Sequence, residues 1–355
     1  MKKRWDIFCK VVDNFGDIGI CWRLARQLHA EHGLDIRLWI DDLSAAQAII
    51  PSLDTEKNVQ ICNEINITKW DDNADFSQAA DVVIEAFACD LPQTYLTAMT
   101  RQQSTWVNLE YLSAETWVDD FHGKPSPKPE QKLIRHFYFQ GFTEKTGGLI
   151  RERNIEAARE TMIESMLKIS LFCYQNAPIQ DFFTALQAST HKVSVYVPES
   201  SILSQIADFF DLETISVGDY LSLENLHVHI LPFLSQMEYD QLLRDCDLNF
   251  VRGEDSWIRA IWAGKPFIWQ PYMQDENAHM VKLNAFLDLF YANYDKKYLP
   301  CEAHRCWSAG QLPKHFLVTY LEDLSDIQAY TRQQSTLLAS QPDLAAKLVI
   351  FCNNI

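Results

Sequence analysis

The sequence predicts an α/β protein made of two doubly wound domains in tandem. Short β-rich runs alternate with helical segments in both halves of the chain, which is typical of βαβ units around a parallel sheet. The length of 355 residues also fits two domains better than one, at about 100–200 residues per domain. A charged, glycine-containing stretch at residues 141–153 interrupts the alternation, which then restarts. We therefore predict an N-terminal domain over 1–150, a C-terminal domain over 151–330, and a helical segment over 331–355 that packs back on the first domain.

The first predicted domain opens with a strand and a helix joined by a short acidic loop. Trp5–Val12 is rich in β-formers, and Ile18–His32 has apolar residues at helical spacing before it stops at Gly33. Further strands are predicted at Ile36–Ile40, Val59–Cys62, Val82–Glu85 and Thr105–Leu109. The proline-rich stretch Phe121–Glu130 is predicted to be a loop.

The second predicted domain repeats the alternation. Its strands are predicted at Lys168–Tyr174, Lys192–Val197, Leu226–Leu231, Leu248–Val251 and Pro266–Trp269, and Phe316–Leu348 is predicted to be mostly helical. In doubly wound domains, ligands bind beyond the carboxyl ends of the strands. The loops that follow the strands are therefore where a site is expected.

Composition excludes several classes of protein. A hydrophobic share of 47% and a charged share of 22% exclude a disordered chain. The net charge of −17 argues against general nucleic-acid binding, which needs a basic surface. The nine cysteines form no CxxC pair and are expected to be small buried hydrophobes in a reducing compartment. Because no apolar stretch approaches about 18 residues, we expect no transmembrane helix and a cytoplasmic protein.

The loop after the first strand carries two carboxylates and two glycines. Asp13 and Asp17 bracket the turn, and a carboxylate placed there could serve as a general base. The alternative is that one of them only caps the following helix. Gly16 and Gly19, from a total of 11 glycines, are expected to permit positive φ and close approach of a ligand. The loop has neither GxGxxG nor a Walker lysine, so a dinucleotide or P-loop site is disfavoured.

The stretch Asn249–Pro271 predicts an anion site. Its strand ends at Arg252, and Glu254, Asp255 and Ser256 begin a helix whose free N–H groups could bind phosphate. Arg252 could neutralise a diphosphate through paired N–H donors. The alternative is an ordinary helix cap beside a surface ion pair.

No pattern in the sequence makes a convincing metal site. The candidates lack a full ligand set and are expected to be structural: His227 with His229, the Cys301–Cys306 segment with His304, and the adjacent aspartates at 41–42, 71–72 and 119–120.

Several long motifs resemble one known family. DNFGDIG (Asp13–Gly19) and FVRGEDSWIRAIWAGKPFIW (Phe250–Trp269), together with EYLSAETWVDDFHG (Glu110–Gly123) and HFYFQGFTEKTGGL (His136–Leu149), resemble the elongation factor P arginine rhamnosyltransferases, the EarP family. The likeness spans almost the whole chain in the same order. It implies two facing Rossmann-like domains in the GT-B arrangement.

The resemblance also implies an activity. Family members are cytoplasmic enzymes that move L-rhamnose from TDP-β-L-rhamnose, with inversion, to an arginine of elongation factor P, which then rescues ribosomes stalled at polyproline. The C-terminal domain would bind the nucleotide sugar and the N-terminal domain the protein acceptor, with no cofactor and no metal. The alternatives are another GT-B nucleotide-sugar enzyme, such as a glycan transferase or an epimerase, or a non-catalytic protein that docks on a translation factor.

Site residues carry over position by position. Asp17 matches the family's proposed general base, Asp13 its partner acid, and Glu254 a third carboxylate needed for activity. Three carboxylates suit an arginine acceptor, because the guanidinium has a pKa above about 12 and is protonated at neutral pH. It must therefore lose a proton as its C–N bond forms. Which of the three accepts the proton is left open by the sequence.

The remaining carried-over residues belong to the donor side. Arg252, Asp255 and Ser256 match residues around the diphosphate and sugar, while Phe172 and Tyr174 match an aromatic wall. Phe233 and Gln236 match residues at the thymine, and Tyr239 stands where other members often carry Phe. The loop residues Asn14, Phe15 and Gly16 are assigned to the donor side as well.

Overall fold

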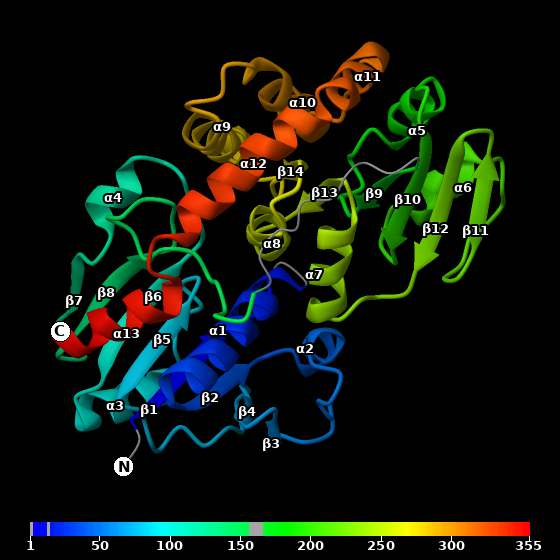
Figure 1. The fold of residues 1–355 in the computed structure, drawn as a ribbon. Coiled ribbons are helices and arrows are strands. Elements are labelled where there is room, and N and C mark those ends of the chain that lie inside the picture. Colours follow the sequence, from blue (N-terminus) through cyan, green and yellow to red (C-terminus); the bar gives the residue numbers. More distant parts are fainter. Residues whose placement is uncertain (1–2, 13–14, 156–165) are drawn as a thin grey trace. The chain divides into compact units, whose positions relative to one another are not determined.

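The computed structural model describes residues 3–12, 15–155 and 166–355, and the chain divides into two compact units (Figure 1). The N-terminal unit comprises Met1–Ile155 together with Ala339–Ile355, and the C-terminal unit comprises Glu156–Leu338. Each unit is built on its own, mostly parallel sheet flanked by helices. The predicted α/β class is therefore confirmed.

The N-terminal unit holds an eight-stranded sheet in the order β3-β4-β2-β1-β5-β6-β8-β7. Only the pairs β3–β4 and β7–β8, at its two edges, are antiparallel. Its strands are β1 (Arg4–Cys9), β2 (Asp35–Ile40), β3 (Val59–Cys62), β4 (Ile65–Lys69), β5 (Val82–Ala86), β6 (Thr105–Glu110), β7 (Pro125–Lys128) and β8 (Leu133–Phe139). Its helices are α1 (Gly16–His32), α2 (Leu43–Ile49), α3 (Gln93–Gln102), α4 (Trp117–Phe121) and α13 (Leu344–Asn354).

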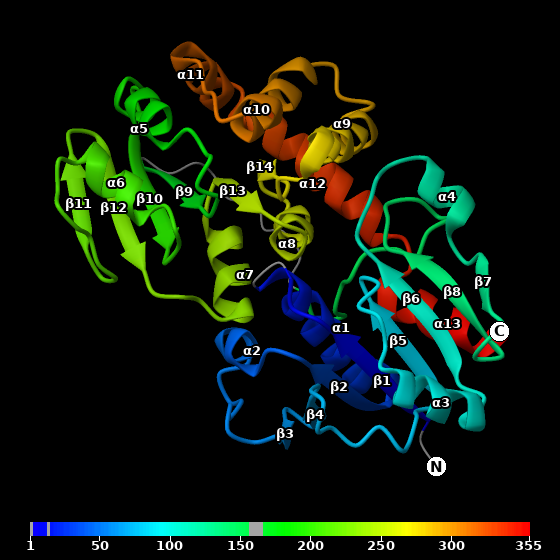
Figure 2. The same cartoon turned by 180° about the vertical axis from the view of Figure 1, so that it is seen from behind.

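The direction of winding reverses between β1 and β5. From β1 the chain builds outward through β2 to β4, and then returns to build through β5, β6 and β8 on the other side. β1 and β5 are neighbours in both views of the fold (Figures 1 and 2). Such a switch point leaves a crevice at the carboxyl ends of the two strands, where ligands bind in open α/β sheets.

Local sequence signals set the ends of several elements. α1 stops at Gly33, which has φ of 65° and donates its N–H to the His29 carbonyl at 3.0 Å. The prediction that Phe121–Glu130 forms a loop is wrong, because β7 lies within it and pairs antiparallel with β8. β7 is an edge strand, so the missing N–H groups of Pro125 and Pro127 break no interior ladder.

The C-terminal unit holds a six-stranded sheet in the order β11-β12-β10-β9-β13-β14, with only β11 antiparallel. Its winding reverses between β9 and β13, in the same manner as in the first unit. Its strands are β9 (Met166–Leu171), β10 (Lys192–Pro198), β11 (Tyr220–Leu223), β12 (Leu226–Leu231), β13 (Leu248–Arg252) and β14 (Phe267–Gln270). Its helical elements are α5 (Ile179–Gln187), α6 (Leu203–Phe209), α7 (Gln236–Asp245), α8 (Asp255–Ala263), η1 (Asp275–Asn277), α9 (Ala278–Phe290), α10 (Tyr298–Ser308), α11 (Lys314–Glu322) and α12 (Leu324–Ala339).

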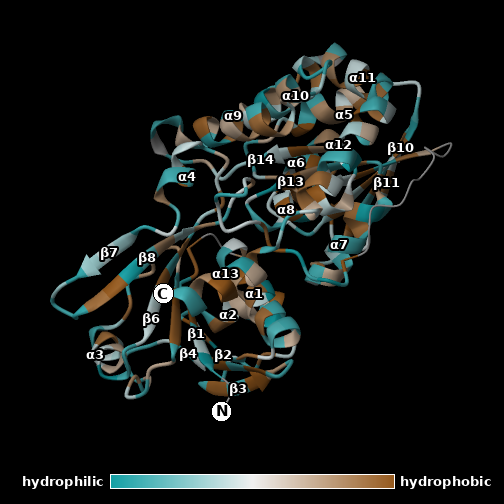
Figure 3. Cartoon of the chain, turned by 60° about the vertical axis from the view of Figure 1, so that its left-hand side comes forward, coloured by the Kyte–Doolittle hydropathy of each residue, from teal (hydrophilic) through white to brown (hydrophobic). Residues whose placement is uncertain are grey.

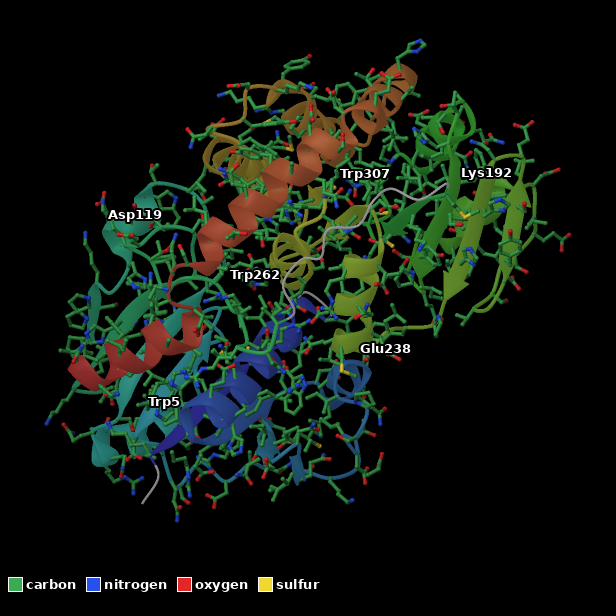
Figure 4. The ribbon with its side chains drawn as sticks, in the orientation of Figure 1. Trp5, Asp119, Lys192, Glu238, Trp262 and Trp307 are labelled. Atoms are coloured by element: carbon green, nitrogen blue, oxygen red, sulfur yellow. The ribbon has the colours of Figure 1, made fainter. Side chains whose placement is uncertain are left out.

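Hydrophobic residues concentrate on the strands and on the helix faces that cover them (Figure 3). In the C-terminal unit, Trp307, which Figure 4 labels, is fully buried. Its ring centroid lies 4.4 Å from that of Phe250. α7 begins with a capping box between Ser235 and Glu238, which fixes the start of that helix.

The cysteines are all unpaired, and each except Cys306 is buried, as predicted. Among the helices of the described ranges, none has the length and apolar character needed to cross a membrane.

Candidate active site

Asp17 lies at the start of α1, directly after the loop that follows β1. Its side chain is buried: the residue is 2% exposed. Oδ2 accepts the backbone N–H of Val12 at 2.9 Å, and Oδ1 accepts the hydroxyl of Tyr111 at 3.3 Å. The N–H groups at the start of the helix also favour a negative charge here. The carboxylate is thus held in one orientation beside the β1–β5 switch point, as a general base requires.

The rest of this loop is only partly described. Asp13 and Asn14 lie outside the described residues, so their predicted roles remain predictions. Phe15 precedes α1 and accepts the N–H of Gly19 at 2.9 Å through its carbonyl. Gly16 and Gly19 both lie inside α1, where the backbone is helical. The expected positive φ at these two glycines is therefore wrong, since the helix begins earlier than predicted.

A pair of aromatic rings follows the neighbouring strands, and the sequence analysis missed it. Phe87, after β5, stacks on Tyr111, after β6, with ring centroids 4.4 Å apart and planes 14° apart. With Lys10, Val12 and Asp90, the pair lines a pocket of about 170 Å³ at the switch point. The signal in the sequence was an aromatic residue directly after each of two strands that flank the switch.

Arg252 organises the corresponding region of the C-terminal unit. It is the last residue of β13, and its guanidinium lies 4.2 Å from the ring centroid of Phe172 and 4.7 Å from that of Tyr174. It also donates to the carbonyl of Cys173 at 3.2 Å. The structure therefore brings together three of the predicted donor residues at the β9–β13 switch point. A planar cation stacked on two rings suits a diphosphate beside an aromatic wall.

The start of α8 lies next to this cation. Ser256 Oγ accepts the N–H of Arg252 at 3.1 Å and donates to the carbonyl of the same residue. Glu254, the residue before the helix, does not cap it and instead binds Lys282 Nζ at 2.5 Å. The N–H groups at the start of a helix favour a bound anion.

Further donor candidates come from α7. Gln236 Nε2 donates to Asp255 Oδ2 at 3.4 Å, which joins the starts of α7 and α8. The ring of Tyr239 meets that of Phe172 edge-on at 5.6 Å, and burial raises the pKa of its phenol. The ring at position 239 therefore packs against Phe172, and either Tyr or Phe could supply this ring. Phe233 is half-buried in the segment between β12 and α7.

Tyr272 is a candidate that the sequence analysis missed. It follows β14, is 53% exposed, and meets Tyr174 edge-on at 5.7 Å. Gln270, at the end of the same strand, accepts the Tyr174 N–H at 2.8 Å through Oε1. Again, the available signal was an aromatic residue just beyond a strand end.

The histidine pair has structural contacts. His227 Nδ1 lies 2.6 Å from the Tyr220 hydroxyl, and His229 stacks on Tyr196 with centroids 4.7 Å apart. Within residues 3–12, 15–155 and 166–355, no group of three or more His, Cys, Asp or Glu side chains could hold a metal ion.

Comparisons with known proteins show the family of the chain. Residues 5–353 match the family model described as elongation factor P (EF-P) rhamnosyltransferase EarP. The chain is 40% identical to the protein-arginine rhamnosyltransferase of Pseudomonas putida, over 100% of both chains. It is 39% identical to that of Pseudomonas aeruginosa, over 98% of each chain.

Solved structures agree on the fold. A structure described as the basis for EarP-mediated arginine glycosylation of translation elongation factor EF-P matches with a TM-score of 0.67 and 29% identity, over 99% of both chains. The spinosyn rhamnosyltransferase SpnG matches with a TM-score of 0.55 at 12% identity, over 98% of this chain and 99% of that one. At that identity the second likeness supports only the GT-B fold.

Proposed function

Because the chain belongs to the EF-P rhamnosyltransferase family EarP, we propose that it is a protein-arginine rhamnosyltransferase acting on translation elongation factor P. The donor is TDP-β-L-rhamnose, and the product is an α-rhamnosyl-arginine on the acceptor loop. In this proposal the modified factor acts in rescue of ribosomes stalled at polyproline, and the enzyme works in the cytoplasm. The observation that carries the proposal is the full-length family match together with the buried Asp17 carboxylate at a switch point.

The proposed reaction has an acceptor side and a donor side. On the acceptor side, a guanidinium nitrogen forms a bond to the anomeric carbon and loses a proton, which Asp17 accepts. Inversion follows because the nitrogen attacks the face opposite the departing diphosphate. Asp13 and Glu254 are assigned to orienting the guanidinium by charge-assisted hydrogen bonds.

On the donor side, the bond between the anomeric carbon and the TDP oxygen breaks. Negative charge then grows on the diphosphate, and we assign its stabilisation to Arg252 and to the N–H groups at the start of α8; the stacking of Arg252 on Phe172 and its bond to Ser256 support this assignment. Phe172 and Tyr174 form the aromatic wall, and Phe233, Gln236 and Tyr239 are assigned to the thymine side. These groups supply the charge stabilisation without a metal or cofactor, which we include in the proposal.

The test is intact-mass spectrometry of purified elongation factor P after incubation with the enzyme and TDP-β-L-rhamnose. Wild type should add one deoxyhexose to the arginine acceptor and none to an acceptor whose loop arginine is replaced by lysine. Asp17→Asn should lower the rate by about a hundredfold or more, the usual contribution of a positioned base. Asp120→Asn, an exposed carboxylate on α4 of the same unit, is the matched control and should behave like wild type. Absence of any mass change with wild type would overturn the proposal.

A further inference from the structure

The loop after β5 adopts a backbone that its residues disfavour. Phe87 has φ of 57°, Ala88 of 53° and Asp90 of 55°, although none of them is glycine. A positive φ is especially costly for a bulky aromatic residue. Such conformations persist only where the surroundings impose them, and they gather at functional sites.

The surroundings do impose this one. The Phe87 N–H donates to the Leu109 carbonyl of β6 at 2.7 Å, and the Ala88 N–H donates to Asn108 Oδ1 at 3.1 Å. The Asp90 N–H donates to Glu85 Oε1 at 3.2 Å. Three hydrogen bonds, to groups on the two adjacent strands, hold the strained loop in place.

The result of this strain is the position of one ring. Phe87 stacks on one face of Tyr111, a residue that is 38% exposed and whose hydroxyl donates to Asp17. An exposed ring backed by a second ring, beside a buried carboxylate, is a binding surface for a planar cation. Lys10 and Asp90 also line the pocket, but both are exposed, and exposed charges contribute little to affinity.

We propose that the Phe87–Tyr111 pair is the platform on which the acceptor guanidinium stacks, and that it makes the enzyme select arginine over lysine. The proposal rests on the rhamnosyltransferase function and assigns the acceptor subsite within it. Guanidinium is planar and weakly hydrated, so it stacks on aromatic faces more readily than the compact lysine ammonium does. The hydroxyl of Tyr111 has a separate role, which is to orient the Asp17 carboxylate.

The positive φ of Phe87 makes glycine a suitable replacement for testing the role of the ring. Phe87→Gly removes the ring and also relieves the positive φ, so loss of function would not be due to added backbone strain. Gln103→Gly is the matched control, because Gln103 also has φ of 57°, directly follows α3 and does not line the pocket. Tyr111→Phe keeps the platform and removes only the hydroxyl.

The measurement is calorimetric binding of two elongation factor P acceptors, one with the loop arginine and one with lysine in its place. Wild type and Gln103→Gly should prefer the arginine acceptor by about five- to thirtyfold, the range of a partly desolvated cation–π contact. Phe87→Gly, in which Tyr111 loses the ring that backs it, should show a smaller preference than either of them. Tyr111→Phe should keep the preference but transfer rhamnose several-fold more slowly.

Each outcome has a distinct meaning. An arginine preference in Phe87→Gly that equals that of Gln103→Gly would overturn the platform. Equal melting temperatures and unchanged TDP binding would show that the variants are folded. Wild type that transfers no rhamnose to the arginine acceptor would overturn the proposed function itself, and this result is distinguishable from failure of the platform alone.

Discussion

Replacing Arg252 by lysine removes the planar guanidinium group but keeps its positive charge. In the structure the guanidinium lies over two rings, at 4.2 Å and 4.7 Å, and binds the Cys173 carbonyl at 3.2 Å. Lysine keeps the positive charge but cannot lie flat on both rings while it offers paired N–H donors to a diphosphate. We therefore expect Arg252→Lys to weaken donor binding rather than abolish it.

The magnitude follows from the contacts that are lost. One charge-assisted hydrogen bond contributes about 1.5–3 kcal/mol, so loss of the second donor costs about 2 kcal/mol of binding free energy. Since about 1.4 kcal/mol is a factor of ten, Kd for TDP should rise about thirtyfold. Arg252→Met removes the remaining charge as well and should raise Kd by about a thousandfold.

The assay is isothermal titration of TDP into wild type and the two Arg252 variants, with melting temperatures measured in parallel. Arg305→Lys, in which a surface arginine on α10 loses its bond to Asn284, is the matched control and should bind TDP like wild type. An unchanged Kd for Arg252→Lys would refute the role assigned to the guanidinium. The same conclusion would follow if both Arg252 variants bound TDP equally well.

Three further predictions concern stability, positioning and pH. Arg259 binds Asp240 through two hydrogen bonds of 3.0 Å and 2.7 Å. Asp240→Ala should therefore lower the free energy of unfolding in urea by about 3–5 kcal/mol, and the double variant Asp240→Leu with Arg259→Met should recover most of this stability. An equal loss of stability in the double variant would contradict this. If Lys282 acts through Glu254, adding Lys282→Met to Glu254→Gln should cause no further loss of kcat, and additional loss would assign Lys282 a separate role. Burial lowers the pKa of His304 from 6.5 to about 4. Between these values the unfolded chain binds more protons at this residue than the folded chain does, so the stability that neutral His304 contributes is full above about pH 6.5 and is lost as pH falls toward 4. This residue alone should make the free energy of unfolding about 2 kcal/mol lower at pH 5 than at pH 7, and His304→Gln should remove that part of the difference in urea titrations.

Much of the fold could be predicted from the order of the elements. The predicted bounds of β3 and β12 agree with the structure, and α1 ends at the glycine that was predicted to stop it. β7 was missed because its prolines oppose strand formation, and only its place at the sheet edge makes them tolerable. Which strand lies at the edge of a sheet depends on how distant strands pair, and a short stretch of sequence holds no information about that pairing.

The candidate site could be predicted only where the residue types themselves were unusual. Asp17 stood out as one of two carboxylates that bracket the turn after the first strand, and Arg252 stood out because it ends a buried strand. Phe87 and Tyr111 did not, because a ring after a strand usually belongs to the core. Tyr111 lies 94 residues from Asp17 in the chain, and their contact exists only because β1, β5 and β6 are adjacent in the sheet.

Hydrogen bonds and ring contacts within the protein hold the residues that we assign to the donor side. Arg252 is fixed by the Cys173 carbonyl and two rings, Ser256 by the backbone of Arg252, and the Trp269 indole donates to the Gly253 carbonyl at 2.7 Å. Groups held in this way need little reorganisation when charge develops on a leaving diphosphate. Such preorganisation is the main source of electrostatic stabilisation of a transition state. Trp269→Phe removes the hydrogen bond to Gly253 without removing a charge, so it should lower kcat more than it raises Kd for TDP. Arg252→Lys should do the reverse, so kcat and Kd measured on both variants would separate preorganisation from simple charge attraction.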